Sequence, residues 1–192
     1  LWGIGQGVIN SPSDGSERVV PSLIVAKDKN ASADDGPQQV DGYYQLATAE
    51  DLFWFASRVN KGYGAINAKL TADIDLEEKE WVPIGATENL SFSGNFDGQG
   101  HRITGLNINK NSGNSAFIGF YSGNGSVNSF SISGTVNYTG NTGDDCVAGV
   151  VGRNNGNLTI HDVMCDVNIN TPNAKGVMVR IAGIVAWMTD GT

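Results

Sequence analysis

The stretch "GSVNSFSISGTVNY", residues 125–138, decides the fold because its pattern returns 33 positions later in "LTIHDVMCDVNIN", residues 158–170. Each apolar residue of the first segment has an apolar or Cys counterpart at that distance: Val127 and Ile160, Phe130 and Val163, Ile132 and Cys165, Val136 and Ile169. Residues that we interpret as turn formers keep the same distance: Gly119 and Gly152, Gly123 and Gly156, Asn124 and Asn157, Asn137 and Asn170. Strand-like repeats of roughly 20 to 50 residues are typical of a solenoid.

Two earlier segments share this pattern. "HRITGLNIN", residues 101–109, matches the 125–138 stretch at a distance of 24 residues, which aligns Ile103 with Val127, Leu106 with Phe130 and Ile108 with Ile132. "AKLTADIDL", residues 68–76, places Leu70, Ala72, Ile74 and Leu76 on one face of a single strand. The four rows predict an all-β fold, a parallel β-helix or β-solenoid, in which Ile132 and Cys165 stack.

One segment has the period of a helix instead. Thr48 followed by Asp51 resembles a capping box, and Lys61 with Gly62 forms a typical end, so we expect a helix over about 48–60. Its apolar face consists of Leu52, Phe55, Ala56 and Val59. We predict that this helix covers the N-terminal end of the stacked strands. The expected organisation is a leader or linker with short strands (1–40), a capping strand and helix (41–64), and β-helix repeats truncated at the C-terminal end (65–192).

Composition excludes some classes of protein. The chain has 192 residues, a net charge of −8 and no basic stripe, so we expect no nucleic-acid partner. No apolar run approaches the ~20 residues of a membrane span, and we expect none in this fragment. The chain begins at Leu1, and "IAGIVAWMTDGT", residues 181–192, opens another repeat. We therefore expect it to be part of a longer multidomain chain.

Candidate catalytic and metal-binding residues are few. Asp97, His101 and Arg102 lie close together in sequence, but we interpret Asp97 as a turn residue, with Gly98 and Gly100 at positive φ. Asp73 and Asp75 could hold Ca²⁺ or act in catalysis, although a solvated strand face explains them as well. His101 and His161 have no metal-ligand spacing, and we find no nucleotide-binding motif. We predict no catalytic residues, no metal site and no cofactor.

The two cysteines, Cys146 and Cys165, are too few for a disulfide framework. Cys165 occupies the position that Ile132 has in the preceding repeat, so we expect the Cys165 thiol to be buried. We expect no disulfide between Cys146 and Cys165.

Aromatic residues are the remaining candidates for ligand binding. We interpret Phe96, Phe117 and Phe130 as core residues. Five others could stack on sugar rings: Tyr43, Tyr44, Trp54, Tyr63 and Trp187. Trp54 lies off the apolar helix face, where packing of the leader over it is the alternative explanation.

Three short segments resemble the GLUG motif of bacterial surface and secreted proteins: "AFIG" at 116–119, "GVVG" at 149–152 and "GIVA" at 183–186. Val or Phe replaces the motif's Leu, and Ala116 and Ala186 replace glycines. The segments "YYQLATAEDLFWFASRVN", "LTADIDLEEKEWVPIG" and "FSGNFDGQGHRITGLNIN" look like the region that precedes GLUG repeats, so the resemblance covers roughly residues 43–192.

The resemblance implies a right-handed β-helix in a large exported bacterial protein, located outside the cell or on its surface. It implies no shared catalytic residues. We therefore expect a non-enzymatic module for adhesion, for spacing, or for weak binding of a glycan or a host or matrix protein. The alternative is a carbohydrate-active β-helix enzyme, either a glycoside hydrolase or a polysaccharide lyase.

Overall fold

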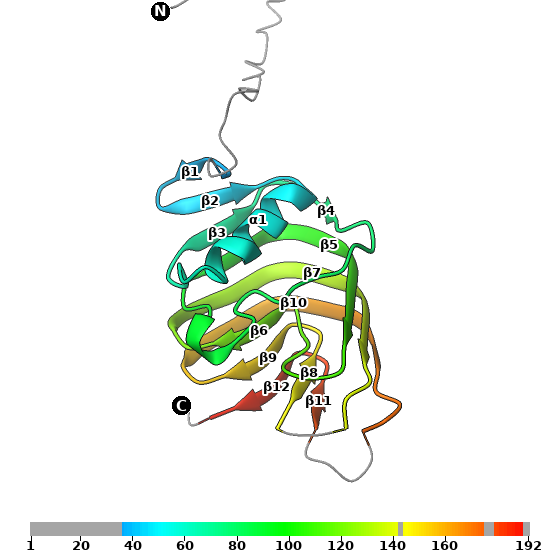
Figure 1. The fold of residues 1–192 in the computed structure, drawn as a ribbon. Coiled ribbons are helices and arrows are strands. Elements are labelled where there is room, and N and C mark those ends of the chain that lie inside the picture. The colour runs from blue at the N-terminus through cyan, green and yellow to red at the C-terminus, as the bar shows by residue number, and fades with distance from the viewer. Residues whose placement is uncertain (1–35, 142–143, 175–178, 190–192) are drawn as a thin grey trace, which may run out of the picture. The chain divides into compact units, whose positions relative to one another are not determined.

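The computed structural model describes residues 36–141, 144–174 and 179–189, and these form a parallel β-solenoid (Figure 1). Three long strands dominate it: β5 (Phe96–Lys110), β7 (Asn124–Tyr138) and β10 (Asn157–Asn170). They belong to a sheet of order β1-β2-β3-β5-β7-β10, in which all pairs except β1 with β2 are parallel. The shorter strands of this sheet are β1 (Gln39–Val40), β2 (Tyr43–Leu46), β3 (Asn67–Leu70) and β4 (Ile74–Asp75), which pairs with β5.

Two smaller parallel sheets complete each coil. One contains β6 (Ile118–Tyr121), β9 (Val151–Asn154) and β12 (Val185–Met188), and the other contains β8 (Cys146–Ala148) and β11 (Arg180–Ala182). Isolated parallel bridges, such as Ile84 with Ile118, extend the stacking to earlier segments. A short 3-10 helix, Glu88–Leu90, lies before β5. The predicted all-β parallel β-helix with an N-terminal α-helical cap is confirmed.

The 33-residue repeat is the register of β7 against β10. Val127 pairs with Ile160, Ile132 with Cys165 and Val136 with Ile169. Asn124 and Asn157 pair in the same ladder, as do Asn137 and Asn170, so these asparagines lie in strands. The interpretation of them as turn residues was wrong.

The predicted 24-residue distance between β5 and β7 is wrong as well. Phe96, and not Ile103, pairs with Val127, and Ile103 pairs with Ile132, so the distance changes from 31 to 29 residues. A second irregularity between Ile103 and Leu106 changes it to 28. Residues 98–100 form a bulge, because Asp97 faces Asn128 whereas His101 already faces Phe130. Apolar and polar residues alternate with a period of two, so several registers fit the sequence equally well.

Residues with positive φ lie at this bulge in β5 and at the corresponding positions of β7 and β10, where the strands bend. Gln99 and Gly100 have φ of 51° and 81°, Ser129 has 58° and Asp162 has 52°. Gly98 was expected at positive φ, but it is needed for a different reason: a Cβ there would overlap Phe130 and the Ser129 carbonyl. The "AKLTADIDL" segment also bends, and it forms β3 and β4 with Ala72 only partly buried between them.

Helix α1 (Ala49–Val59) confirms the predicted helix. Thr48 is the N-cap, and its hydroxyl accepts a hydrogen bond from the Asp51 N–H at 3.2 Å, while the Asp51 side chain accepts one from the Thr48 N–H at 3.1 Å. The predicted apolar face is buried in full: Leu52, Phe55, Ala56 and Val59. Phe55 packs edge-on against Phe92, with ring centroids 5.7 Å apart, so the helix completes the core at this end.

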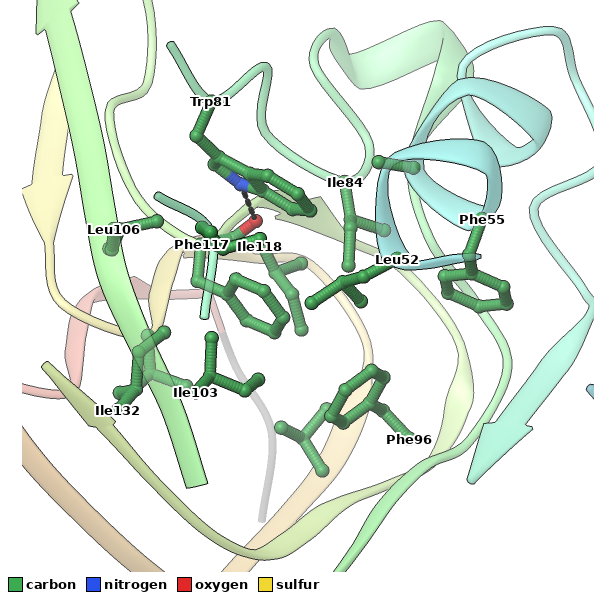
Figure 2. Packing of buried hydrophobic residues seen from close by; sticks show 14 of the residues in the cluster. Leu52, Phe55, Trp81, Ile84, Phe96, Ile103, Leu106, Phe117, Ile118 and Ile132 are labelled. Carbon is green, nitrogen blue, oxygen red and sulfur yellow. Dashed lines mark hydrogen bonds between the residues drawn. The ribbon is translucent and has the colours of Figure 1, made fainter. Parts of the chain in front are cut away.

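Aliphatic and aromatic side chains together fill the interior of the solenoid (Figure 2). Trp81 stacks on Phe117 with centroids 5.3 Å apart, and its indole N–H donates to the Phe117 carbonyl at 3.0 Å. Phe117 in turn contacts Phe96 and Phe130. The prediction that Phe96, Phe117 and Phe130 are core residues is confirmed, and the buried indole N–H has the partner that burial requires.

Cys146 and Cys165 are free, which agrees with the prediction of no disulfide. Cys165, for which we expected a buried thiol, is only partly buried, whereas Cys146 is fully buried. Cys165 lies on β10, which has a partner along one edge only among the described residues. Its column is apolar, but no described coil covers it.

Residues 1–35, most of the predicted leader, lie outside the described residues. Of the leader, the structure describes residues 36–40, which include β1. The described residues all belong to one compact unit. No helix among them is long and apolar enough to cross a membrane.

Candidate functional site

The five aromatic candidates do not form one binding platform. Tyr43 and Tyr44 lie on β2, Trp54 on α1 and Tyr63 in the loop after it, whereas Trp187 lies on β12, in the last described coil. Each of these rings contacts other groups of the protein. The Arg58 guanidinium lies 3.7 Å from the centroid of Tyr63, and the Lys69 ammonium lies 4.6 Å from that of Tyr43.

Trp54 packs against Tyr44, with centroids 5.0 Å apart, and Gly36 lies directly against its indole. This contact supports the explanation that the end of the leader packs over Trp54. Trp187 has the Arg180 guanidinium 3.2 Å from its centroid and that of Arg153 at 5.0 Å. The guanidinium groups of Arg180 and Arg153 thus lie over the Trp187 ring, on which a sugar would have to stack.

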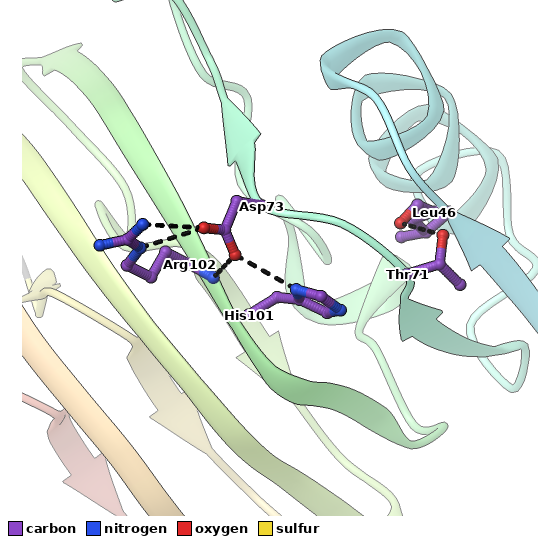
Figure 3. Close-up of polar contacts among 5 residues, drawn as sticks. All are labelled: Leu46, Thr71, Asp73, His101 and Arg102. Carbon is purple, nitrogen blue, oxygen red and sulfur yellow. Dashed lines mark hydrogen bonds and ion pairs between the residues drawn. The ribbon is translucent and has the colours of Figure 1, made fainter.

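Asp73, His101 and Arg102 form the most conspicuous charged cluster (Figure 3). Asp73 accepts hydrogen bonds from the Arg102 guanidinium at 3.0 and 3.1 Å and from the Arg102 backbone N–H at 3.0 Å. His101 Nδ1 lies 3.2 Å from the same carboxylate. His101 and Arg102 therefore hold a carboxylate of the preceding coil and not Asp97, their neighbour in sequence.

The carboxylates of Asp73, Asp75 and Asp97 each accept a hydrogen bond from a backbone N–H. The Arg102 N–H, the Arg102 guanidinium and His101, in that order, lower the pKa of Asp73, so the carboxylate stays ionised. Asp97 accepts the Gln99 N–H at 3.0 Å, which is the local backbone contact that we predicted, but Asp97 lies in β5 beside the bulge and not in a turn between strands. Asp75 accepts the Glu77 N–H at 2.9 Å. None of these contacts joins two carboxylates in an acid–base pair.

Within the ranges that the structure describes, no group of three His, Cys, Asp or Glu residues could hold a metal ion. His161 contacts Asp162 at 2.9 Å, and His101 contacts Asp73. Each pair supplies two ligand atoms, too few for a protein metal site.

The outer surface of the long strands carries two columns of small, neutral polar side chains, Asn107, Thr135 and Asn168 in one and Asn109, Asn137 and Asn170 in the other. They alternate with the buried residues of β5 and β7, so they point away from the core. We call this surface the polar face, and it consists of Thr104, Asn107, Asn109, Ser131, Ser133, Thr135, Asn137, Asn168 and Asn170. Pairing in register brings residues from three coils into rows at the strand spacing of about 4.8 Å.

One column is a hydrogen-bonded ladder. The Asn170 amide donates to the Asn137 Oδ1 at 2.9 Å, and Asn137 donates to the Asn109 Oδ1 at 2.9 Å. Asn109 donates to Glu80 at 2.8 Å and to Asn107 at 3.0 Å. The ladder therefore crosses four coils, and it holds the Glu80 carboxylate in a structural role.

Two depressions lie on either side of this ladder. One, of about 480 Å³, is lined by Asn109, Lys110, Asn111, Ser112, Asn137 and Thr139. The other, of about 320 Å³, is lined by Glu78, Gly105, Leu106, Asn107, Gly134, Thr135 and Asn137. Asn137 lines both, so they adjoin. Both volumes fall in the range of sites for small ligands, about 300 to 1,000 Å³.

Sequence reasoning missed the polar face. The signal was present, since Asn137 and Asn170 keep the 33-residue distance and alternate with Val136 and Ile169. Asn is common in turns, and this favoured the wrong interpretation.

The fold and its columns define a β-solenoid repeat protein. No known family's sequence profile matches the chain, and no solved structure matches it. The chain is 35% identical over 97 residues to a "Putative Gly-rich membrane protein" of Evansella cellulosilytica. That stretch covers 47% of this chain and 11% of the relative, so the similarity concerns a small part of a much longer protein.

Proposed function

We propose that the chain is a non-enzymatic, surface-exposed module of a bacterial exported protein, which acts in adhesion by weak binding of a glycan or a protein. The observation that carries this proposal is the polar face, a repeated array of amides and hydroxyls. The GLUG resemblance and the similarity to a bacterial protein with "membrane" in its name support the proposed location outside the cell or on its surface.

Repetition suits a weak binder. Two outward positions carry small amides or hydroxyls in three successive coils, Asn107, Thr135 and Asn168 at one and Asn109, Asn137 and Asn170 at the other, so several units of a polymer can be bound at once. Linked weak contacts of this kind raise the overall affinity through a high effective concentration, without any strong single contact. Asp73, Asp75 and Asp97, the acidic residues considered for catalysis, have structural partners, which also favours binding over reaction.

A carbohydrate-active enzyme is the second candidate. It is favoured by a depression at the bend of the strands, lined by Gln99, Gly100, Arg102, Ser129, Phe130, Ser131, Asp162 and Met164. This depression lies beside the charged cluster of Figure 3, because Arg102 belongs to both. A hydrolase would need one of these carboxylates as a proton donor, and Asp73 is held in its ionised form.

A glycan array followed by a reducing-sugar assay on every hit separates the two candidates. We expect binding without release of new reducing ends, and without the ultraviolet absorbance of the unsaturated product that a lyase makes. Turnover that disappears in Asp73→Ala or Asp162→Asn, while circular dichroism shows a folded protein, would establish the enzyme instead.

A further inference from the structure

The two depressions beside the Asn ladder adjoin at Asn137, and together we call them the groove along β7. Thr135 lines one of them, Thr139 the other, and Asn137 both. Thr135 and Asn137 alternate within β7, so their side chains point to the same side, and Thr139, the residue after the strand, lines the same depression as Asn137. At about 3.3 Å per residue they span about 13 Å, the length of a short stretch of polymer rather than of a single small molecule.

The central amide keeps hydrogen-bonding capacity for a ligand. Asn137 uses one N–H to donate to Asn109, and its Oδ1 accepts one N–H from Asn170. An amide has two N–H donors and an oxygen with two acceptor positions, so one of each stays unused by these ladder bonds. The ladder also fixes the orientation of the amide, so little rotamer freedom is lost on binding.

The lining points to a hydroxylated ligand without charge. Hydroxyls and amides dominate, from Asn109, Asn111, Ser112 and Thr139 in one depression and from Asn107 and Thr135 in the other. The charged side chains in the lining are Glu78 and Lys110, at opposite ends, so neither sign prevails along the groove. The net charge of −8 disfavours a polyanion.

We propose that this groove binds a neutral, hydroxyl-rich carbohydrate chain that lies along β7, with Asn137 at its centre and Thr135 and Thr139 on either side. This inference rests on the proposed function and gives it a site and a class of ligand. Sugar hydroxyls both donate and accept hydrogen bonds, as the amides and hydroxyls of the groove do.

The test is affinity gel electrophoresis of the whole chain with three neutral polysaccharides, namely mixed-linkage β-glucan, xylan and galactomannan. Polygalacturonate and alginate form the acidic arm. We expect at least one neutral polymer to retard the protein and neither acidic polymer to do so. Asn137→Ala should weaken the retardation at least tenfold in dissociation constant, and Thr135→Val and Thr139→Val at least threefold each.

Asn95→Ala is the matched control. Asn95 also links neighbouring coils, since it donates to the Asn67 Oδ1 at 3.0 Å and accepts the Ser126 N–H at 2.9 Å, but it does not line the groove. Its affinity should stay within twofold of the parent. Thr135→Val and Thr139→Val keep the shape of the side chain, so they test the groove even if Asn137→Ala destabilises the fold.

Failure of this inference is distinguishable from failure of the proposed function. Retardation by a neutral polymer that survives all three groove substitutions, retardation by the acidic polymers alone, or no retardation by any of the five would overturn the groove. Cleavage of a retarded polymer would overturn the non-enzymatic function, whatever the groove variants do.

Discussion

The coils of β7 and β10 have the same pattern of residues and different environments. Ile132 is 1% exposed, whereas Cys165, its partner in the next coil, is only partly buried. Val136 and Ile169 differ in the same way. Burial in a solenoid thus depends on whether a further coil is stacked on the column, and not on the residues of the column alone.

The largest effect should come from the interior. Trp81→Ala removes the stacking on Phe117 and a buried hydrogen bond, so we expect a loss of about 3 to 5 kcal/mol in the free energy of unfolding, measured in urea. Trp187→Ala, in the last described coil, should cost less than half as much. Equal losses would contradict the difference between the two regions.

Ile132→Ala and Ile169→Ala compare apolar residues of the two coils directly. We expect a loss of about 2 to 5 kcal/mol for Ile132, because the cavity is enclosed, and less than half of that for Ile169. The same urea titrations measure both. A larger loss at Ile169 would mean that another part of the chain covers β10 in solution.

Replacing each cysteine by serine compares a buried position with a partly exposed one. Cys146→Ser buries a hydroxyl and should cost about 1 to 3 kcal/mol, whereas Cys165→Ser should cost less, since that side chain is partly exposed. Both thiols are free, so a reductant should leave the melting temperature of the parent unchanged. A drop in melting temperature on reduction would reveal a disulfide.

Helix α1 covers the core at the other end of the solenoid. Its N-cap should contribute less to the free energy of unfolding than the core residues do. Thr48→Ala removes the hydroxyl that accepts the Asp51 N–H, so we expect a loss of about 1 kcal/mol. Thr87, at the N-cap of the 3-10 helix, makes no side-chain cap bond, so Thr87→Ala is a matched control with almost no effect. Equal losses would show that the capping bond does not matter.

The smallest effect should be the acid dependence of the charged cluster. The folded pKa of Asp73 is lowered, so its contribution to stability is complete above its unfolded pKa of about 3.9 and disappears as the pH falls below that value. Asp73→Asn should reduce the fall in the melting temperature of the protein as the pH drops below about 3.9. An unchanged acid profile would mean that Arg102 and His101 add nothing there.

Sequence reasoning reached the fold where the chain repeats without interruption. Between β7 and β10 the distance between paired residues stays at 33, from Val127 with Ile160 to Val136 with Ile169. The spacing of apolar residues in the sequence therefore gave the true register. It failed between β5 and β7, because the bulge at 98–100 shifts the register and alternation alone fits several alignments equally well. Helix α1 was predictable because its cap and its apolar face are both local in sequence.

The polar face and the charged cluster depend on contacts between coils. Asp73 meets Arg102 across 29 positions, and Asn109 meets Asn137 across 28. Neither distance equals the 33 residues visible in the sequence, so the partners could not be assigned before the bulges were known. Residue type also misled, since an Asn in a strand looks the same in sequence as an Asn in a turn.

The stacking of coils has a mechanical consequence. The hydrogen bonds between long strands are directed from one coil to the next, so a pull along the stack loads them end-on, one coil boundary at a time. A coil of 33 residues, such as that from Val127 to Ile160, releases at most roughly 110 to 120 Å of extended chain when it detaches. Under tension such a module lengthens in steps, and the chain remains continuous while the coils are lost.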